Sequence, residues 1–263
     1  MRGQDVVMIH PTAIIHPGAR LAEGVSVGAY SLIGEHVEIG EGTRIGPHVV
    51  VEGHTRIGRD NEIFQFCSIG ASPQDKKYDD EPTRLEIGDR NTIREFCSFN
   101  VGTSQDAHVT RVGNDNWIMA YVHVAHDCQV GDHTIFANNA TLAGHVHVGD
   151  WAILGGFTGV HQFCRVGAHS FCGVGTVLLQ DLPPFVTVAG NPAKPHGINS
   201  EGLKRRGYSA EGIAAIKRAY RALYRSGLTL DEARQRVAEI AATQPEVGLF
   251  SEFIAESGRG LVR

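Results

Sequence analysis

Branched aliphatic residues recur at every sixth position over the first two thirds of the chain. The first series is Ile9, Ile15, Leu21, Val27, Ile33, Ile39, Ile45, Val51, Ile57, Ile63 and Ile69, and its phase returns at Ile87, Ile93 and Phe99. A second series, in a shifted phase, is Val112, Ile118, Val124, Val130, Phe136, Leu142, Val148, Leu154, Val160, Val166, Cys172 and Leu178. Neither the 3.6-residue period of a helix nor the two-residue alternation of a strand produces this spacing.

Each six-residue unit is best interpreted as a short strand followed by a corner. The residue directly after the aliphatic is often glycine. The fourth residue after the aliphatic is usually small. We expect the aliphatic and the small residue to point inward, and the glycine to relieve crowding or to permit a positive φ. Three units close a triangular coil of 18 residues, so the pattern predicts a parallel β-helix, an all-β solenoid whose stacked coils pair their backbone groups.

The cysteines are explained by the same pattern. Four of them occupy the small inward position and one the aliphatic position: Cys67, Cys97, Cys128, Cys164 and Cys172. Because free cysteine behaves as a small buried hydrophobe, we expect no disulfide framework, no zinc site built on cysteines and no cysteine nucleophile. A reducing cytoplasm is the simplest location for such a chain.

Two interruptions of the pattern, at about residues 71–86 and 101–111, are expected to project as loops from the solenoid. Insertions in repeat proteins tend to collect on the binding face, and long ordered loops often carry function. The solenoid is expected to occupy residues 1–190 and a C-terminal α-helical domain residues 191–263. Ser209, the Thr229–Glu232 capping box and Pro245 each mark a helix start in that domain, which would cover the last coil.

Composition and charge exclude several classes of function. The 24 basic side chains nearly balance the 29 acidic ones, which gives no electrostatic footprint for nucleic acid. No stretch of the sequence is apolar for long enough to span a membrane. Phosphate-loop and nucleophile-elbow motifs are absent, and we therefore expect direct transfer between two bound substrates, without a cofactor.

A cluster of histidines in the second half of the chain is the candidate site. In 18-residue coils, His126 lies beneath Gly144 and Gly144 beneath Gln162, while Asp127 lies beneath His145. Coils about 4.8 Å apart would bring these residues, together with His161, to one edge. A histidine is suited to deprotonate a hydroxyl group, and a carboxylate can orient it. Asp127 reaches His126 only if the chain bends there; otherwise it serves another ring or the backbone.

Two other interpretations of the histidines stay open at this point. The spacing also suits a zinc site, as in hexapeptide-repeat proteins that act as carbonic anhydrases. The histidines could also form a polar ladder between subunits in a scaffold without catalytic activity.

Several strings in the chain are more specific than the repeat itself. They are Asn61-Glu62-Ile63, Gln74-Asp75 with Lys77, Glu81-Pro82-Thr83-Arg84, His126-Asp127-Cys128, Ala137 to His145, Val160-His161-Gln162-Phe163 and Glu201 to Gly207. With these strings the chain resembles the acyl-[acyl carrier protein]–UDP-N-acetylglucosamine O-acyltransferases of lipid A biosynthesis along essentially its whole length. The resemblance implies a left-handed β-helix, a homotrimer, and acyl carrier protein and UDP-N-acetylglucosamine as substrates. Other sugar acyltransferases of the same fold are the alternative within this class.

The resemblance also implies roles for particular residues. His126 would be the general base for the sugar 3-hydroxyl, Asp127 its orienting partner, and the Gly144 N–H part of an oxyanion hole. The sugar and acyl groove would be lined by Gln74, Asp75, Lys77, His123, His145, His161 and Gln162, and the nucleotide contacted by Asn199, Glu201 and Arg205. No residue is assigned to a metal.

Two departures from the family pattern affect the expected specificity. The family often reads His-Arg-Gly-Thr where this chain reads Asn100-Val101-Gly102-Thr103. Members that select long acyl chains carry paired glycines at the end of the acyl groove, where this chain has Gly173-Val174. We expect these two residues to act as the acyl-chain ruler, and the volume of Val174 to favour a shorter chain.

Overall fold

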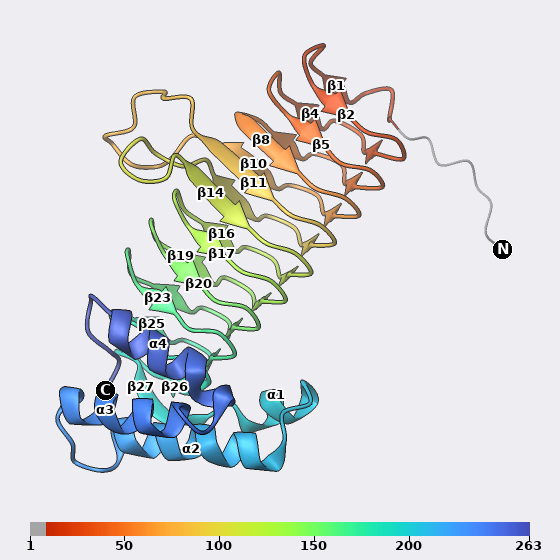
Figure 1. Ribbon diagram of the computed structural model, residues 1–263. Coiled ribbons are helices and arrows are strands. Elements are labelled where there is room, and N and C mark those ends of the chain that lie inside the picture. Colours follow the sequence, from red (N-terminus) through yellow and green to blue (C-terminus); the bar gives the residue numbers. More distant parts are fainter. Residues whose placement is uncertain (1–8) are drawn as a thin grey trace.

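The computed structural model describes residues 9–263 and has the form of a triangular prism closed at its C-terminal end by helices (Figure 1). Three sheets, parallel except for the last strand of one of them, form the sides of the prism, and as far as residue 178 the chain visits them in the same order in every coil. The result is the expected left-handed parallel β-helix followed by a helical region. Within residues 9–263, no helix is both long enough and apolar enough to cross a bilayer.

Most strands contain only two residues, because the corners take up the rest of each six-residue unit. The nine-stranded sheet consists of β1 (Ile14–Ile15), β4 (Leu32–Ile33), β7 (Val50–Val51), β10 (Ser68–Ala71), β13 (Ser98–Asn100), β16 (His123–Val124), β19 (Thr141–Leu142), β22 (Gly159–Val160) and β25 (Val177–Leu178). The eight-stranded sheet consists of β2 (Arg20–Leu21), β5 (Glu38–Ile39), β8 (His54–Ile57), β11 (Arg84–Ile87), β14 (Val109–Val112), β17 (Gln129–Val130), β20 (His147–Val148) and β23 (Arg165–Val166). The ten-stranded sheet consists of β3 (Ser26–Val27), β6 (Arg44–Ile45), β9 (Glu62–Ile63), β12 (Thr92–Ile93), β15 (Trp117–Ile118), β18 (Ile135–Phe136), β21 (Ile153–Leu154), β24 (Phe171–Cys172), β26 (Val186–Ala189) and β27 (Lys194–Ile198).

The pairing register confirms the 18-residue coil. Val124 pairs with Leu142, and Leu142 with Val160, as the spacing predicts. The register lengthens at two places, where Ile69 pairs with Phe99 and Ile87 with Val112. The extra residues are the two insertions, and the regular coils resume unchanged after each.

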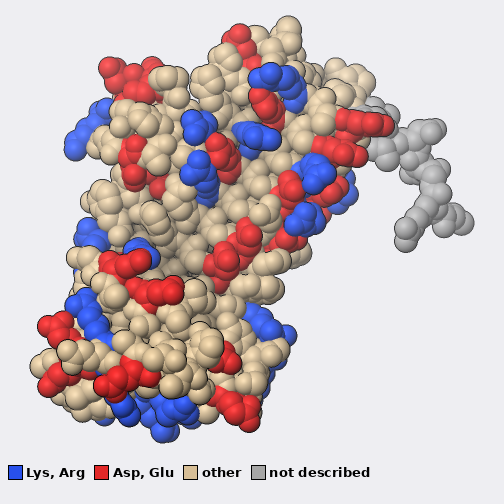
Figure 2. All heavy atoms as spheres, in the orientation of Figure 1, with Lys and Arg blue, Asp and Glu red and all other residues tan. Residues whose placement is uncertain are grey.

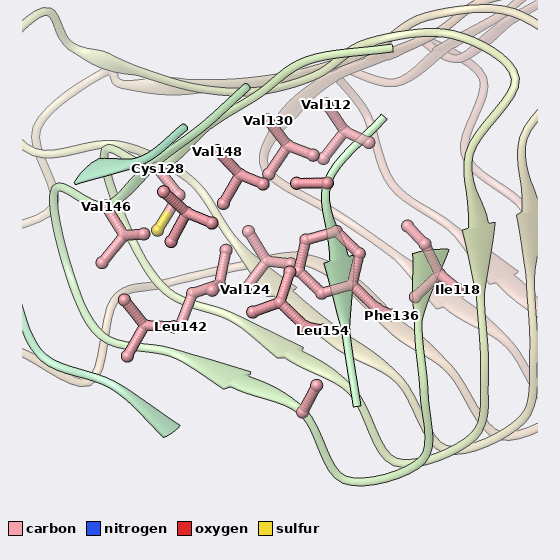
Figure 3. Close-up of a cluster of buried hydrophobic side chains, with 14 of the residues drawn as sticks. Val112, Ile118, Val124, Cys128, Val130, Phe136, Leu142, Val146, Val148 and Leu154 are labelled. Carbon is pink, nitrogen blue, oxygen red and sulfur yellow. The ribbon is translucent and has the colours of Figure 1, made fainter. Parts of the chain in front are cut away.

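The interior of the prism is filled by the residues at the aliphatic and small positions. Figure 3 shows Val124, Phe136, Leu142 and Leu154 directed into the space between the three sheets. All five cysteines are buried and free, as expected from their positions in the repeat. Because each coil buries its apolar groups against the coils on either side, the core is continuous along the axis.

At most positions the glycine that follows the aliphatic relieves crowding and has no positive φ, and Gly70, at φ +84°, is an exception. A Cβ atom on Gly28 would lie 2.5 Å from the Pro47 nitrogen of the next coil. Positive φ falls two residues later, on side-chain-bearing residues such as Tyr30 and Trp151. Many of these side chains stack along the edges of the prism, which offsets part of the cost of the left-handed conformation.

Both insertions leave the prism at the same edge, between the nine-stranded and the eight-stranded sheets, and we call this edge the insertion edge (Figure 1). Residues 72–83 connect β10 to β11, and residues 101–108 connect β13 to β14. The predicted ranges reach a few residues further, into strands that belong to the regular coil. The two loops contact each other through a hydrogen bond from Ser104 Oγ to Glu81 Oε1 (2.6 Å).

Sheet pairing continues past residue 190, where we expected the helical domain to begin. β26 and β27 form an antiparallel hairpin at the end of the ten-stranded sheet, and residues 190–193 join them, beginning with Gly190 at φ +99°. The helices that follow are α1 (Ser200–Arg205), α2 (Ala210–Tyr224), α3 (Leu230–Ala241), the 3₁₀ turn η1 (Pro245–Val247) and α4 (Gly248–Glu256). They cover the last coil, as Figure 1 shows.

The helix starts follow the expected capping residues. Ser209 Oγ accepts a hydrogen bond from the Gly212 N–H and caps α2. Thr229 and Glu232 form the predicted capping box at α3. Pro245 is the first residue of η1, which continues directly into α4.

Basic and acidic side chains are intermixed along the surface that Figure 2 shows, and at the helical end one group of basic side chains lies at the bottom of the view, with acidic side chains around it. On the eight-stranded sheet, Arg111 forms an ion pair with Glu86, and Arg20 forms one with Glu38. The exposed face of α2 carries Lys217, Arg218 and Arg221, and Arg225 follows as the exposed C-cap residue.

Candidate functional site

The predicted histidine cluster lies on the insertion edge. His126 and Asp127 follow β16, Gly144 and His145 follow β19, and His161 and Gln162 follow β22. The backbone confirms the stacking, because the His145 N–H donates to His126 O (3.0 Å) and the Phe163 N–H to Gly144 O (3.1 Å). Both insertions project from the same edge, so the loops and the cluster are neighbours.

Asp127 reaches His126 because the chain bends at that residue. Asp127 has a φ of +59°, the left-handed conformation that recurs at the corners. This bend turns its carboxylate back, and Asp127 Oδ2 lies 2.9 Å from His126 Nδ1. Oδ2 is also 3.8 Å from Nδ1 of His145 on the next coil. The question that strand alternation left open is thus answered in favour of a direct His126–Asp127 pair.

Asp127 is buried, and its two carboxylate oxygens accept hydrogen bonds from Thr103 of the second insertion. The Thr103 N–H donates to Oδ1 (2.9 Å), and the Thr103 hydroxyl donates to Oδ2 (2.6 Å). Burial raises the pKa of Asp127, but the hydrogen bonds from His126 and Thr103 outweigh it and hold the pKa below the ordinary value. An ionised carboxylate only accepts hydrogen bonds, so the proton of the pair belongs on His126 Nδ1. Nε2 is then left as a hydrogen-bond acceptor and base.

The ring of His126 lies directly against Gly144. A Cβ atom at Gly144 would be 2.5 Å from Cε1 and 2.7 Å from Nε2 of His126, so only glycine leaves room for this ring position. Among residues 9–263, no backbone partner accepts the Gly144 N–H. A free N–H beside the reactive nitrogen can bind an oxygen atom of a substrate.

His145 is held by a second carboxylate and by a stacked ring. Its Nδ1 lies 2.8 Å from Asp106 Oδ2, which comes from the insertion at 101–108. Its ring stacks on Phe163, with centroids 4.3 Å apart, and meets His126 edge-on at 5.0 Å. The ring orientation is therefore fixed from two directions.

His123 and His161 flank the pair at the border of the nine-stranded sheet. His123 Nδ1 lies 2.8 Å from Ser98 Oγ on the preceding coil. Burial lowers the pKa of His123 below its ordinary value, and the nearby His126 lowers it further, against an opposite effect of the contact with Ser98 that is smaller than that of burial. His161 and Gln162 are exposed, and His161 Nδ1 contacts Gln162 O (3.1 Å).

The predicted residues of the first insertion lie on the same edge but make no direct contact with the cluster in the described part of the chain. Gln74 and Lys77 are exposed, and Asp75 Oδ1 accepts a hydrogen bond from the Lys77 N–H (3.0 Å). Their loop projects outward from the prism (Figure 1).

The remaining predicted residues lie on other edges of the same chain. Gly173 and Val174 follow β24 at the edge between the ten-stranded and nine-stranded sheets, and Val174 is 77% exposed. Asn199 precedes α1, where its side chain accepts from the Gly202 N–H and donates to His169 O. Glu201 is paired with Lys204 (2.7 Å), and Arg205 is exposed.

Sequence reasoning assigned no role to Thr103, Asp106 or Ser98, although all three contact the cluster. Thr103 gave a weak signal, as a threonine within a string that departs from the family pattern. Asp106 gave none, since its contact with His145 depends on the path of an insertion that the repeat does not describe.

The cluster also has the composition of a metal site. Ligand atoms of His126, Asp127 and His145 lie within 4.8 Å of one another. However, the atoms that approach one another are already used: the Asp127 oxygens accept three hydrogen bonds, and His145 Nδ1 faces Asp106. This arrangement suits an oriented base better than a metal ligand set.

Two family models match the chain. Residues 110–144 match the bacterial transferase hexapeptide model of six repeats, and residues 181–262 match domain 2 of UDP-N-acetylglucosamine O-acyltransferase.

Relatives extend the match to nearly the whole chain. The acyl-[acyl-carrier-protein]–UDP-N-acetylglucosamine O-acyltransferase of Thiobacillus denitrificans is 64% identical over 97% of this chain and 99% of its own. The structure of LpxA from Acinetobacter baumannii is 49% identical, with a TM-score of 0.95 over 97% of this chain and 100% of that one. UDP-N-acetylglucosamine O-acyltransferase (LpxA) from Moraxella catarrhalis is 46% identical, with a TM-score of 0.94 over 97% and 100% of the two chains. Fold and relatives agree: this chain belongs to the family of acyl-[acyl-carrier-protein]–UDP-N-acetylglucosamine O-acyltransferases.

Proposed function

We propose that this chain transfers a 3-hydroxyacyl group from acyl carrier protein to the 3-hydroxyl of UDP-N-acetylglucosamine, in lipid A biosynthesis, with His126 as general base. The family supports the reaction, and relatives at 64% and 62% identity carry the name of this activity. The observation that carries the assignment of His126 is the pair formed with buried, ionised Asp127, at 2.9 Å.

The reaction follows from the protonation states of the pair. Nε2 of His126 takes the proton of the sugar hydroxyl while its oxygen attacks the thioester carbonyl of the donor. The C–O bond forms, the C–S bond breaks, and the proton on Nε2 passes to the departing thiolate. Asp127 stabilises the imidazolium that exists between the two proton transfers, and stays ionised throughout.

Gly144 supplies the electrostatic part of the mechanism. The thioester oxygen becomes negatively charged as the hydroxyl attacks, and the free N–H of Gly144 lies beside His126 on the next coil. A donor preset for that oxygen stabilises the transition state more than the ground state.

The substrate groove extends along the nine-stranded sheet and is completed by a second copy of the chain in a homotrimer. His126 and the ruler residues Gly173 and Val174 lie on the two edges that border this sheet. Neighbouring outward positions near its N-terminal end are apolar and exposed, with Ile14 at 65%, Leu32 at 39% and Val50 at 37%. Such a face is typical of an interface between subunits. Cytoplasmic location agrees with five buried free thiols.

Gln74, Asp75, Lys77, His123, His145, His161 and Gln162 line this groove in the proposal, and Asn199, Glu201 and Arg205 contact the nucleotide at the helical end. The exposed basic face of α2 offers a docking surface for an acidic carrier protein.

The test is acyl transfer from 3-hydroxyacyl carrier protein to UDP-N-acetylglucosamine in chelator-treated buffer. We expect the unmodified protein to be active and His126→Ala to lose at least about 100-fold in kcat. His36→Ala is the matched control, because this exposed histidine lies on the same edge near the other end of the solenoid. Activity only after addition of zinc would contradict the proposal and favour the metal interpretation.

A further inference from the structure

The second insertion, residues 101–108, contacts both residues that flank the reactive ring of His126. Thr103 donates two hydrogen bonds to Asp127, and Asp106 accepts one from His145. Asp127 and His145 belong to two successive coils, and this one short loop therefore connects the two coils at the outer surface of the solenoid.

The contacts of Thr103 hold the Asp127 carboxylate in one orientation. Thr103 and Asp127 are each only 1% exposed, so water does not compete for their hydrogen bonds. One donor is the backbone N–H and the other is the hydroxyl, and each binds a different oxygen of the carboxylate. Together they fix both the position and the rotation of the carboxylate plane. The Asp127 N–H is held as well, by Thr110 Oγ1 at 2.8 Å.

Orientation of the carboxylate determines what His126 can do. Asp127 Oδ2 is the hydrogen-bond partner of His126 Nδ1, and a carboxylate free to rotate would bind that nitrogen for only part of the time. The imidazole would then adopt the other tautomer more often, with the proton on Nε2, and in that form it cannot accept the substrate proton.

We propose that Thr103 is a positioning residue for catalysis, holding Asp127 so that His126 keeps Nε2 free as the base, and that Asp106 holds His145 in the same way for substrate binding. This inference rests on the proposed function and adds two residues to it. Neither residue touches substrate in this scheme; each acts through its partner.

The first experiment compares Thr103→Val with Thr103→Ser in the acyl-transfer assay. Valine keeps the shape but removes the hydroxyl donor, and a hydrogen bond to a charged group is strong enough that its loss lowers kcat about 10- to 100-fold. The KM values for both substrates should change less than about twofold. Serine restores the hydroxyl and should return most of kcat.

A purely structural role is tested by two controls. Thr43→Val removes another fully buried hydroxyl, which donates to Gly58 O (2.8 Å) far from the cluster, and kcat should be unchanged. In an Asp127→Ala background, Thr103→Val should cause no further loss of kcat, because its partner is already gone. The proposal would be overturned if Thr103→Val lowered kcat by the same factor in the Asp127→Ala background as in the unmodified protein. It would also be overturned if Thr103→Val alone kept kcat within twofold of the unmodified value.

Asp106→Asn tests the second contact and stays informative if Thr103→Val fails to fold, since the Asp106 side chain is 45% exposed. We expect a several-fold higher KM for UDP-N-acetylglucosamine with kcat within about twofold. Unchanged KM would overturn the role of Asp106. Inactivity of the unmodified protein and of Thr43→Val together would instead refute the proposed function and this inference with it.

Discussion

Residues with a positive φ recur at the corners of this solenoid, and the site depends on one of them. Tyr30, Phe66 and Tyr121 adopt this conformation and stack in one column along an edge. Asp127 occupies an equivalent corner position, but its side chain turns toward His126. A backbone requirement of the repeat therefore also directs the Asp127 carboxylate to His126, and no separate distortion is needed for this contact.

Gly144→Ala should abolish most activity without unfolding the chain. The new Cβ would lie 2.5 Å from His126 Cε1 and push the ring away from its position, which we expect to lower kcat by about 100-fold or more. Steady-state kinetics with both substrates measures the effect.

Gly248→Ala, in α4, is the matched control, since its Cβ would have no other atom within 4 Å. Equal activity of Gly144→Ala and Gly248→Ala would contradict the assigned geometry.

Val174→Gly should shift the acyl preference toward longer chains. Val174 is 77% exposed beside the proposed groove, and removing its side chain adds space at the groove end without opening a cavity in the core. A series of acyl carrier protein thioesters of increasing length, compared by kcat/KM, provides the measurement. An unmodified enzyme that works best with the longest chain, or an unchanged optimum in the variant, would argue against the ruler.

At the scale of elements, the helical region is joined to the solenoid through a buried histidine. His169 stacks between Trp151 and Phe185 of the last coils. Its Nε2 lies 3.2 Å from the Tyr208 hydroxyl, and its Nδ1 lies 3.4 Å from Arg206 Nη1. Burial, and the neighbouring charge of Arg206, lower the pKa of His169 to about 4. The packing of the cap thus requires a neutral ring.

Acidification should therefore loosen the cap before it affects the coils. The folded pKa lies below the ordinary value of 6.5, so the unfolded chain binds the proton more readily, and stability falls as pH drops from about 6.5 toward 4. The shift corresponds to about 3 kcal/mol at most. Thermal melts between pH 7.5 and pH 5 should show a smaller decrease in Tm for His169→Phe, which keeps the stacked ring but cannot be protonated.

His123 and His147 also have pKa values lowered by burial, so some pH dependence will remain in His169→Phe. An identical pH dependence in both proteins would show that His169 does not couple the cap to protonation.

The periodic elements could be predicted from the sequence, and the insertions could not. Each coil repeats the same inward positions, so the spacing of Val124, Leu142 and Val160 is enough to place His126, Gly144 and Gln162 in one stack. Thr103 and Asp106 lie in residues that interrupt the repeat, and their positions depend on how one loop folds over the edge. Asp127 is intermediate, because strand alternation leaves its direction open until the corner geometry is known.

At the scale of the whole molecule, the predicted site residues are divided among the edges of the prism. His126 lies on one edge of the nine-stranded sheet and Val174 on the other, with apolar outward residues such as Leu32 on the sheet between them. One chain alone leaves this face open, which is why the proposed groove includes a second copy of the chain.

We expect the protein in solution to have three times the 28.4 kDa mass of one chain. A Leu32→Asp, Val50→Asp double variant places two charges on the exposed apolar face, and burying them in an interface is costly. Light scattering should then report a smaller species, with activity lost in parallel. The control is Arg44→Asp, on the ten-stranded sheet, which should have the same mass in solution as the unmodified protein. If the Leu32→Asp, Val50→Asp variant also kept that mass, the interface would lie elsewhere.

The antiparallel strand β27 has a consequence for the length of the molecule. A solenoid of identical coils resembles a one-dimensional crystal, with an 18-residue unit cell and no inherent reason to stop growing. β27 runs against the direction of every other strand in its sheet, so it cannot template a further parallel coil. The helices then cover what the reversed strand leaves exposed. The hairpin of β26 and β27 thus ends the stacking of parallel coils. Without it the last coil could pair with another molecule end to end, whereas with it the solenoid has a defined length.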